Sequence, residues 1–151
     1  MQFVGSNFAM KNKPFEFRIG HSHTVCKFIS PETPVRYAEA SGDRNPLHLD
    51  AEAATQRGLG GAVLHGMCSM AFMLSGLMLL CGESVFIRDV DLRFSFPVIP
   101  GEVVVFKYVV ARTEPGRLEF AVSARNSAGR EVLKNVRVGA VIRNSSQEHT
   151  I

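Results

Sequence analysis

The sequence has few cysteines and no N-terminal targeting pattern. Its three cysteines, Cys26, Cys68 and Cys81, are odd in number and not closely paired. This argues against a disulfide framework and favours reduced, mostly buried thiols, so a cytoplasmic protein is expected. The first 30 residues contain no basic start followed by an apolar core, so no signal peptide is predicted.

Long apolar runs and clusters of positive charge are also missing. The most apolar stretch, 67–81, is interrupted by Ser69, Ser75 and Gly76, and it is shorter than the roughly 20 residues that span a bilayer. Lysine and arginine are scattered, and the net charge of +3 is small. Neither a membrane nor a nucleic acid is therefore expected as a partner.

The composition that is present is that of an ordinary globular protein. Hydrophobic residues make up 46% of the 151 residues and charged residues 21%, without an internal repeat or a linker. A chain of this length can bury one sizeable hydrophobic core. We therefore predict a single domain over 1–151, with irregular ends at 1–14 and 144–151.

The first half of the chain predicts short elements followed by one long helix. The signals are alternating apolar residues for strands, proline at the first helical position, and glycine just after a helix. In chain order, they predict one or two strands within 15–29, a helix ending near Ser41, a loop or turn over 43–49, a helix over 50–57 and a helix over 66–80. The last helix is apolar on every side, so other structure must cover it.

The second half predicts an antiparallel sheet. Segments rich in Val, Ile and Phe alternate with strong turn signals, and short turns join antiparallel strands. The predicted strands are 85–98, 102–111, 118–125 and 131–142. The expected fold class is α+β, with a curved antiparallel sheet wrapped around one long buried helix. Open sheet edges favour pairing with a second copy, so a homodimer is expected.

A compact polar motif precedes the apolar helix. Asp43 and His48 flank a rigid Asn45-Pro46 turn, and Gly66 begins the helix further along. A carboxylate and an imidazole can share one water in complementary protonation states. Free N–H groups at the start of a helix can stabilise a developing oxyanion. The motif therefore predicts a reaction site.

The motif resembles that of a known family. Gly-Asp-x-Asn-Pro-Leu-His at 42–48, followed by His-Gly-Met at 65–67, resembles the MaoC-like family of hotdog-fold (R)-specific enoyl-thioester hydratases and dehydratases. The resemblance implies a hotdog fold and the reversible syn addition of water to trans-2-enoyl-CoA, giving (R)-3-hydroxyacyl-CoA. The alternative within this class is a 3-hydroxyacyl-ACP dehydratase of fatty-acid synthesis. No separate cofactor is implied, because coenzyme A or the acyl-carrier pantetheine is part of the acyl thioester substrate.

The same resemblance implies roles for individual residues. The catalytic groups would be Asp43, His48 and the backbone N–H of Gly66, supported by Asn45 and His65. Substrate contacts are predicted at Met67, Ser69, Met70 and Arg93, and no metal ligand is expected. Simpler interpretations compete with some of these roles. His65 can serve the Gly66 turn structurally, Ser69 and Ser75 can bond back to helix carbonyls, and Arg93 can lie on a solvated sheet face.

Other classes of function stay open at this stage. His48, Asp50 and His65 are also the ligand types of a mononuclear iron site, which would make the protein an oxygenase. A non-catalytic hotdog subunit would only bind acyl groups, and a related subunit could replace the second copy in the dimer. A thioesterase would use the same fold for hydrolysis.

Overall fold

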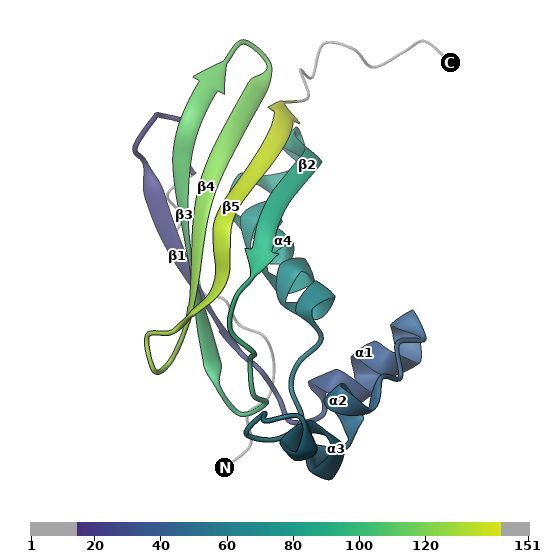
Figure 1. Ribbon diagram of the computed structural model, residues 1–151. Helices are drawn as coiled ribbons and strands as arrows, with labels where there is room; N and C mark the ends of the chain where they lie inside the picture. The colour runs from purple at the N-terminus through teal and green to yellow at the C-terminus, as the bar shows by residue number, and fades with distance from the viewer. Residues whose placement is uncertain (1–14, 143–151) are drawn as a thin grey trace, which may run out of the picture.

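Residues 15–142 are described by the computed structural model, and they form a five-stranded antiparallel sheet packed against one long helix (Figure 1). The strands are β1 (Ser22–Phe28), β2 (Val85–Phe94), β3 (Val103–Glu114), β4 (Arg117–Asn126) and β5 (Glu131–Ile142). The helices are α1 (Thr33–Ser41), α2 (Pro46–Leu49), α3 (Ala51–Gln56) and α4 (Gly66–Cys81), followed by the 3-10 turn η1 (Gly82–Ser84). The α+β class is confirmed, while the two ends predicted to be irregular lie outside the described residues.

The strands are arranged in the order β1-β3-β4-β5-β2, and every neighbouring pair is antiparallel. β3 with β4 and β4 with β5 form hairpins, as the turn signals predict. β2 and β3 are consecutive in the chain but are separated by β4 and β5, so the turn at 99–101 does not make a hairpin. β1 begins at Ser22, and the alternating residues 15–19 are not part of a strand.

The backbone between β2 and β3 bonds to other parts of the chain. The predicted strand ends early, at Phe94. Beyond it, Val98 O accepts a hydrogen bond from Leu64 N–H at 2.8 Å, and Gly101 N–H donates to Ile29 O at 2.7 Å. This segment therefore leaves the sheet and ties the residues before α4 to the end of β1.

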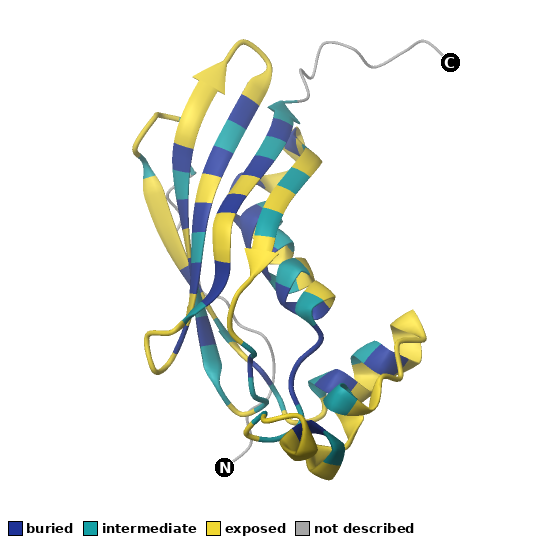
Figure 2. Cartoon of the chain, in the orientation of Figure 1, coloured by how far each residue is buried: buried dark blue, intermediate teal, exposed yellow. Residues whose placement is uncertain are grey.

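The hydrophobic core lies between α4 and the inner face of the sheet (Figure 2). Met73 and Leu77 of α4 are completely buried there, in one cluster with Phe106 and Tyr108 of β3. The Tyr108 hydroxyl donates to Met73 O at 2.7 Å. A side chain on Gly76 would collide with that hydroxyl, so glycine is needed for this close approach of α4 and β3.

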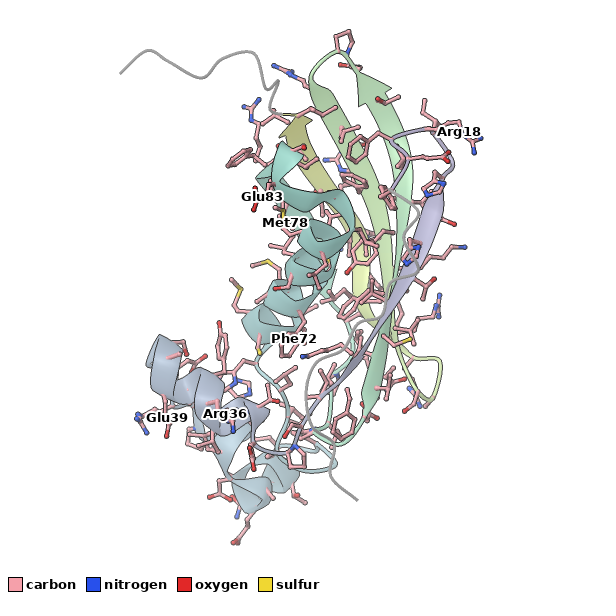
Figure 3. All side chains as sticks on the ribbon, turned by 180° about the vertical axis from the view of Figure 1, so that it is seen from behind. Arg18, Arg36, Glu39, Phe72, Met78 and Glu83 are labelled. Atoms are coloured by element: carbon pink, nitrogen blue, oxygen red, sulfur yellow. The ribbon has the colours of Figure 1, made fainter. Side chains whose placement is uncertain are left out.

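The side of α4 that faces away from the sheet is open. Met67, Ala71, Ser75 and Leu79 recur every four residues along it, and Met67 and Leu79 are 51% and 60% exposed. Figure 3 shows Met78 on the side of α4 away from β1, whereas Phe72 lies between α4 and β1. The sheet thus covers one side of the apolar helix within the described chain.

The apolar character of α4 is not by itself evidence for a membrane span. By length and composition alone, the helical segment 66–84 would suit one, but a single such helix is weak evidence because core helices share these properties. One side of α4 carries the protein core, as Met73 and Leu77 show. The other side is an apolar surface that is exposed within the described chain.

Candidate active site

The loop that carries Asp43 leads directly into a short helix. The prediction of a loop over 43–49 is wrong for its second half, because Pro46–Leu49 forms α2. Pro46 occupies the first helical position, and Asn45 Oδ1 accepts a hydrogen bond from Leu47 N–H at 3.1 Å. Asn45 N–H donates to Asp43 Oδ1 at 3.2 Å. Asn45 therefore caps α2 with its side chain and orients Asp43 with its backbone.

His48 is fixed by a backbone carbonyl of the segment before α4. Its Nδ1 lies 2.8 Å from Val63 O. Because a carbonyl oxygen only accepts hydrogen bonds, Nδ1 carries the proton, and in neutral His48 the lone pair is on Nε2. Val63 N–H also donates to Leu47 O at 3.0 Å, so α2 is held to this segment by two hydrogen bonds.

His65 brings Asp43 and His48 together. Its Nε2 lies 2.9 Å from Asp43 O, and its ring stacks on the His48 ring with centroids 3.8 Å apart and planes 27° apart. One polar side-chain atom from each of these three residues lies within 4.8 Å of the others. Asp43 is exposed, His48 is half-buried and His65 is buried. The two predicted proton carriers therefore do meet in space.

A cavity of about 220 Å³ opens beside the start of α4. Gly66 and Ser69 line it on the helix side, and Phe94, Phe96 and Leu133 contribute apolar walls. Among the described residues, nothing accepts a hydrogen bond from Gly66 N–H, as is usual for the first turn of a helix. A side-chain carbon on Gly66 would lie 3.0–3.3 Å from the Phe94 ring, so glycine keeps this place open.

The cavity and the histidine cluster are adjacent but not identical. Asp43 and His48 are not among the residues that line the cavity. They are connected to it by His65, which binds Asp43 and directly precedes Gly66. The structure therefore places the predicted proton carriers and the predicted oxyanion amide on either side of one buried residue.

The predicted substrate contacts are divided between the cavity and the surface. Ser69 is buried and lines the cavity, Met70 is half-buried and Met67 is exposed. Arg93 is exposed and adjacent to Phe94 in β2, so it points to the opposite face of the sheet from the cavity. Within residues 15–142, neither Ser69 nor Ser75 hydrogen-bonds to a helix carbonyl, which corrects that interpretation.

Some contacts of the site have no signal in the sequence. The Tyr37 ring packs on His65 with centroids 4.7 Å apart, and Val63 acts through its carbonyl. Phe94 lines the cavity, although the pattern of β2 marks it only as an apolar residue. Tyr37 lies outside the motif at 42–48 and 65–67, and a backbone carbonyl such as Val63 O has no sequence signature.

The iron-site hypothesis predicted the wrong carboxylate. Asp50 caps α3, accepting hydrogen bonds from Glu52 N–H at 2.8 Å and Ala53 N–H at 3.2 Å. Asp43 joins the two histidines instead. The two imidazoles stack on each other, and each uses one ring nitrogen in a hydrogen bond to a backbone carbonyl, which leaves one nitrogen free on each ring.

Comparison with known proteins assigns the family. The family model described as "MaoC like domain" matches residues 9–132. The 3-hydroxyacyl-thioester dehydratase Y of Mycobacterium tuberculosis is 40% identical over 104 residues, which are 67% of this chain and 35% of that protein. The 3-hydroxybutyryl-CoA dehydratase of Methylorubrum extorquens is 31% identical over 120 residues, covering 78% of this chain and 76% of that protein.

A solved structure shows the same fold. The unliganded (R)-hydratase of Pseudomonas aeruginosa superposes with a TM-score of 0.78 at 24% identity, covering 91% of this chain and 96% of that one. The antiparallel sheet packed on α4 is thus a hotdog fold, as predicted. The chain spans about a third of the length of the Mycobacterium tuberculosis relative, 35%. This chain belongs to the MaoC-like family.

Proposed function

We propose that this protein is a hydro-lyase that reversibly adds water to the double bond of a trans-2-enoyl thioester. The observation that carries the proposal is the meeting of Asp43 and His48, whose polar atoms lie within 4.8 Å of each other. Water addition needs a group that takes a proton from water and a group that returns one to carbon. A carboxylate and a neutral imidazole at this separation can hold a single water between them.

The hydrogen bond of the His48 ring supports a role as the base. Because Nδ1–H donates to Val63 O, the Nε2 lone pair is available to the water. As the water oxygen bonds to C3 of the substrate, one water proton moves to Nε2, while Asp43 accepts a hydrogen bond from the other. The Asp43–His48 pair then returns one proton to C2 on the same face. One water is consumed, and the product is a 3-hydroxyacyl thioester of (R) configuration.

The start of α4 supplies the third group. As C3 is attacked, negative charge develops on the thioester oxygen. Gly66 N–H is free to donate to that oxygen, and the positive end of the helix dipole adds to the stabilisation. The apolar walls of the neighbouring cavity give the acyl chain a place to bind. In the reverse direction the same groups dehydrate a 3-hydroxyacyl thioester. This is the class of substrate for which the relatives from Mycobacterium tuberculosis and Methylorubrum extorquens are named.

An absorbance assay for loss of the enoyl-thioester double bond tests this function. Short and long trans-2-enoyl groups are offered on coenzyme A and on acyl carrier protein, which separates the CoA hydratase from the carrier-protein dehydratase. Asp43→Asn and His48→Gln are compared with Asp50→Asn and His23→Gln, the same changes at a helix cap and at an exposed position of β1. We expect activity in the wild type and in the two controls. Wild-type protein inactive on all these thioesters, or cleaving them to free thiol as a thioesterase would, contradicts the proposal.

We also propose that the active form is a homodimer. The open side of α4 is apolar, and Asp43 is exposed in the single chain. An exposed carboxylate would react in bulk water, where electrostatic stabilisation is weak. A second copy over α4 would cover the apolar residues and close the site at once. A related subunit in place of the second copy is the alternative, which co-purification from the source cell would detect.

A further inference from the structure

The centre of the site is occupied by a histidine that takes no part in the proposed chemistry. His65 directly precedes α4 and is 1% exposed. Its side chain does not cap the helix, because it makes no hydrogen bond to the first turn. Capping of α4 therefore does not explain the presence of His65. Its side chain contacts Asp43 and His48 instead.

One contact of His65 holds the backbone of Asp43. Its Nε2–H donates to Asp43 O at 2.9 Å. Asp43 lies on an exposed loop, and its carboxylate accepts only the local hydrogen bond from Asn45 N–H among the described residues. The bond from His65 is thus the link in the described structure that joins this loop to the start of α4.

The other contact of His65 holds the ring of His48. The two rings stack at 3.8 Å, and the Tyr37 ring also packs on His65, with centroids 4.7 Å apart. His48 has one hydrogen bond, from Nδ1 to Val63 O, and a ring held by one bond can still turn about it. Face-to-face contact with His65 removes that freedom and keeps Nε2 directed at the reaction site.

The remaining nitrogen of His65 argues against a purely structural role. Its Nδ1 is buried and has no hydrogen-bond partner among residues 15–142. A buried polar atom without a partner lowers stability, and an apolar ring would fill the same space without that cost. A second proton on Nδ1 would also lack an acceptor. His65 is therefore suited to one neutral tautomer, with its proton on Nε2, opposite to that of His48.

We infer that His65 is a positioning residue that sets the geometry of the Asp43–His48 pair from both sides. Its N–H fixes the Asp43 loop, and its ring fixes the His48 imidazole. The inference rests on the proposed function, since it concerns how well the pair adds water. It goes further because it makes the rate of the reaction depend on a residue that contacts neither the water nor the thioester.

Two substitutions separate the two contacts. His65→Gln keeps an amide N–H near the position of Nε2 but removes the ring. His65→Phe keeps a ring but removes the N–H. We expect each to lower kcat for enoyl-thioester hydration by about 10- to 100-fold, with KM changed by less than about threefold, because misplaced groups slow the chemical step rather than binding. His23→Gln and His23→Phe are the matched controls, at an exposed position of β1.

Nitrogen-15 NMR of the imidazoles gives a readout that a merely structural role would not change. We expect wild-type His48 to be protonated on Nδ1 and His65 on Nε2. The His48 signal should broaden in folded His65→Gln, where the ring contact is lost, and stay sharp in folded His65→Phe, which keeps a ring against His48. Wild-type kcat in either variant, or an unchanged His48 signal in His65→Gln, overturns the inference. Should the variants fail to fold, a wild-type His65 protonated on Nδ1 overturns it and one protonated on Nε2 supports it. A wild type without hydratase activity defeats the proposed function, while this spectrum still decides the tautomers.

Discussion

The chemistry of the site depends on single atoms whose partners are backbone carbonyls. Val63 O directs the proton of His48 to Nδ1, and Asp43 O directs that of His65 to Nε2. Neither carbonyl can be altered by changing its own side chain. The tautomers of the two histidines are therefore set by the path of the backbone. Substitutions that move this backbone should slow the reaction as strongly as changes in the histidines themselves.

Gly66 provides the sharpest single-residue prediction. In Gly66→Ala the new carbon would lie 3.0–3.3 Å from the Phe94 ring, so the ring is pushed into the space proposed for the thioester oxygen. We expect kcat to fall by at least about tenfold. Gly66 is the first residue of α4, where the helix preference of alanine over glycine has little effect, so the stability of the variant should change by less than about 1 kcal/mol. Steady-state kinetics and thermal unfolding measure the two effects separately.

A second substitution controls for the cause of that loss. Phe94→Ala removes the ring that the new carbon would displace. The double variant Gly66→Ala/Phe94→Ala should regain activity relative to Gly66→Ala alone. If it is no more active, crowding by Phe94 is not the reason that glycine is needed.

The three thiols should differ in reactivity. Burial raises the pKa of Cys68 to about 11, against the opposing charge of Lys27, and burial raises the pKa of Cys81 to about 12. The thiolate is the reactive form, so at pH 8 these two groups stay protonated and unreactive. Cys26 is exposed. A chromogenic thiol reagent should therefore titrate one group quickly in folded protein and three after denaturation, and Cys26→Ser should remove the fast phase. Rapid reaction of all three in the native state would contradict this burial.

At the scale of elements, the position of α4 is set by its contact with β3. Gly76 leaves room for the Tyr108 hydroxyl, which donates to Met73 O at 2.7 Å. Gly76→Ala should destabilise the protein by roughly 1–3 kcal/mol through overpacking. Tyr108→Phe should cost about 1 kcal/mol, the net value of a hydrogen bond.

The combination of these two variants tests the contact itself. Because Tyr108→Phe removes the atom with which the alanine collides, the double variant should lose less stability than the sum of the two single losses. Urea denaturation of the four proteins gives the free energies of unfolding. Additive losses would mean that the two residues do not meet.

The sequence predicts an element well where its pattern is continuous over a long segment. The strand at 131–142 coincides with β5, and the helix at 66–80 differs from α4 only at its last residue. The short helix α2 was missed because four residues give little periodicity, although Asn45 and Pro46 carry a cap and a first-position signal. The position of β2 at the far edge of the sheet was missed because distant backbone hydrogen bonds decide it.

The candidate site was predictable to a different degree. Asp43, His48 and Gly66 follow from the motif, and the structure brings Asp43 and His48 together. The arrangement of His65 between them does not follow, since ring stacking depends on how the segment before α4 passes α2. The catalytic roles of these residues stay predictions until activity is measured.

At the scale of the whole molecule, the open side of α4 predicts a dimer. We expect the wild-type protein to sediment as twice the chain mass of 16.6 kDa. Leu79→Glu places a charge on this side, where the residue is 60% exposed in the single chain, and should yield monomers with reduced hydratase activity. Ile19→Glu, at a residue 58% exposed outside α4, is the matched control and should stay dimeric. A fully active wild-type monomer would contradict the proposed assembly.

The central claim is that Asp43 and His48 act as one unit on a single water. A double-variant cycle with Asp43→Asn, His48→Gln and their combination, measured as kcat/KM for hydration of a trans-2-enoyl thioester, tests it most directly. We predict that each single change lowers kcat/KM by about 10²- to 10⁴-fold, and that the combined variant is no slower than the slower single one, because groups that act together lose their effect together. Near-normal rates in either single variant, or losses that multiply in the combined one, would contradict the account.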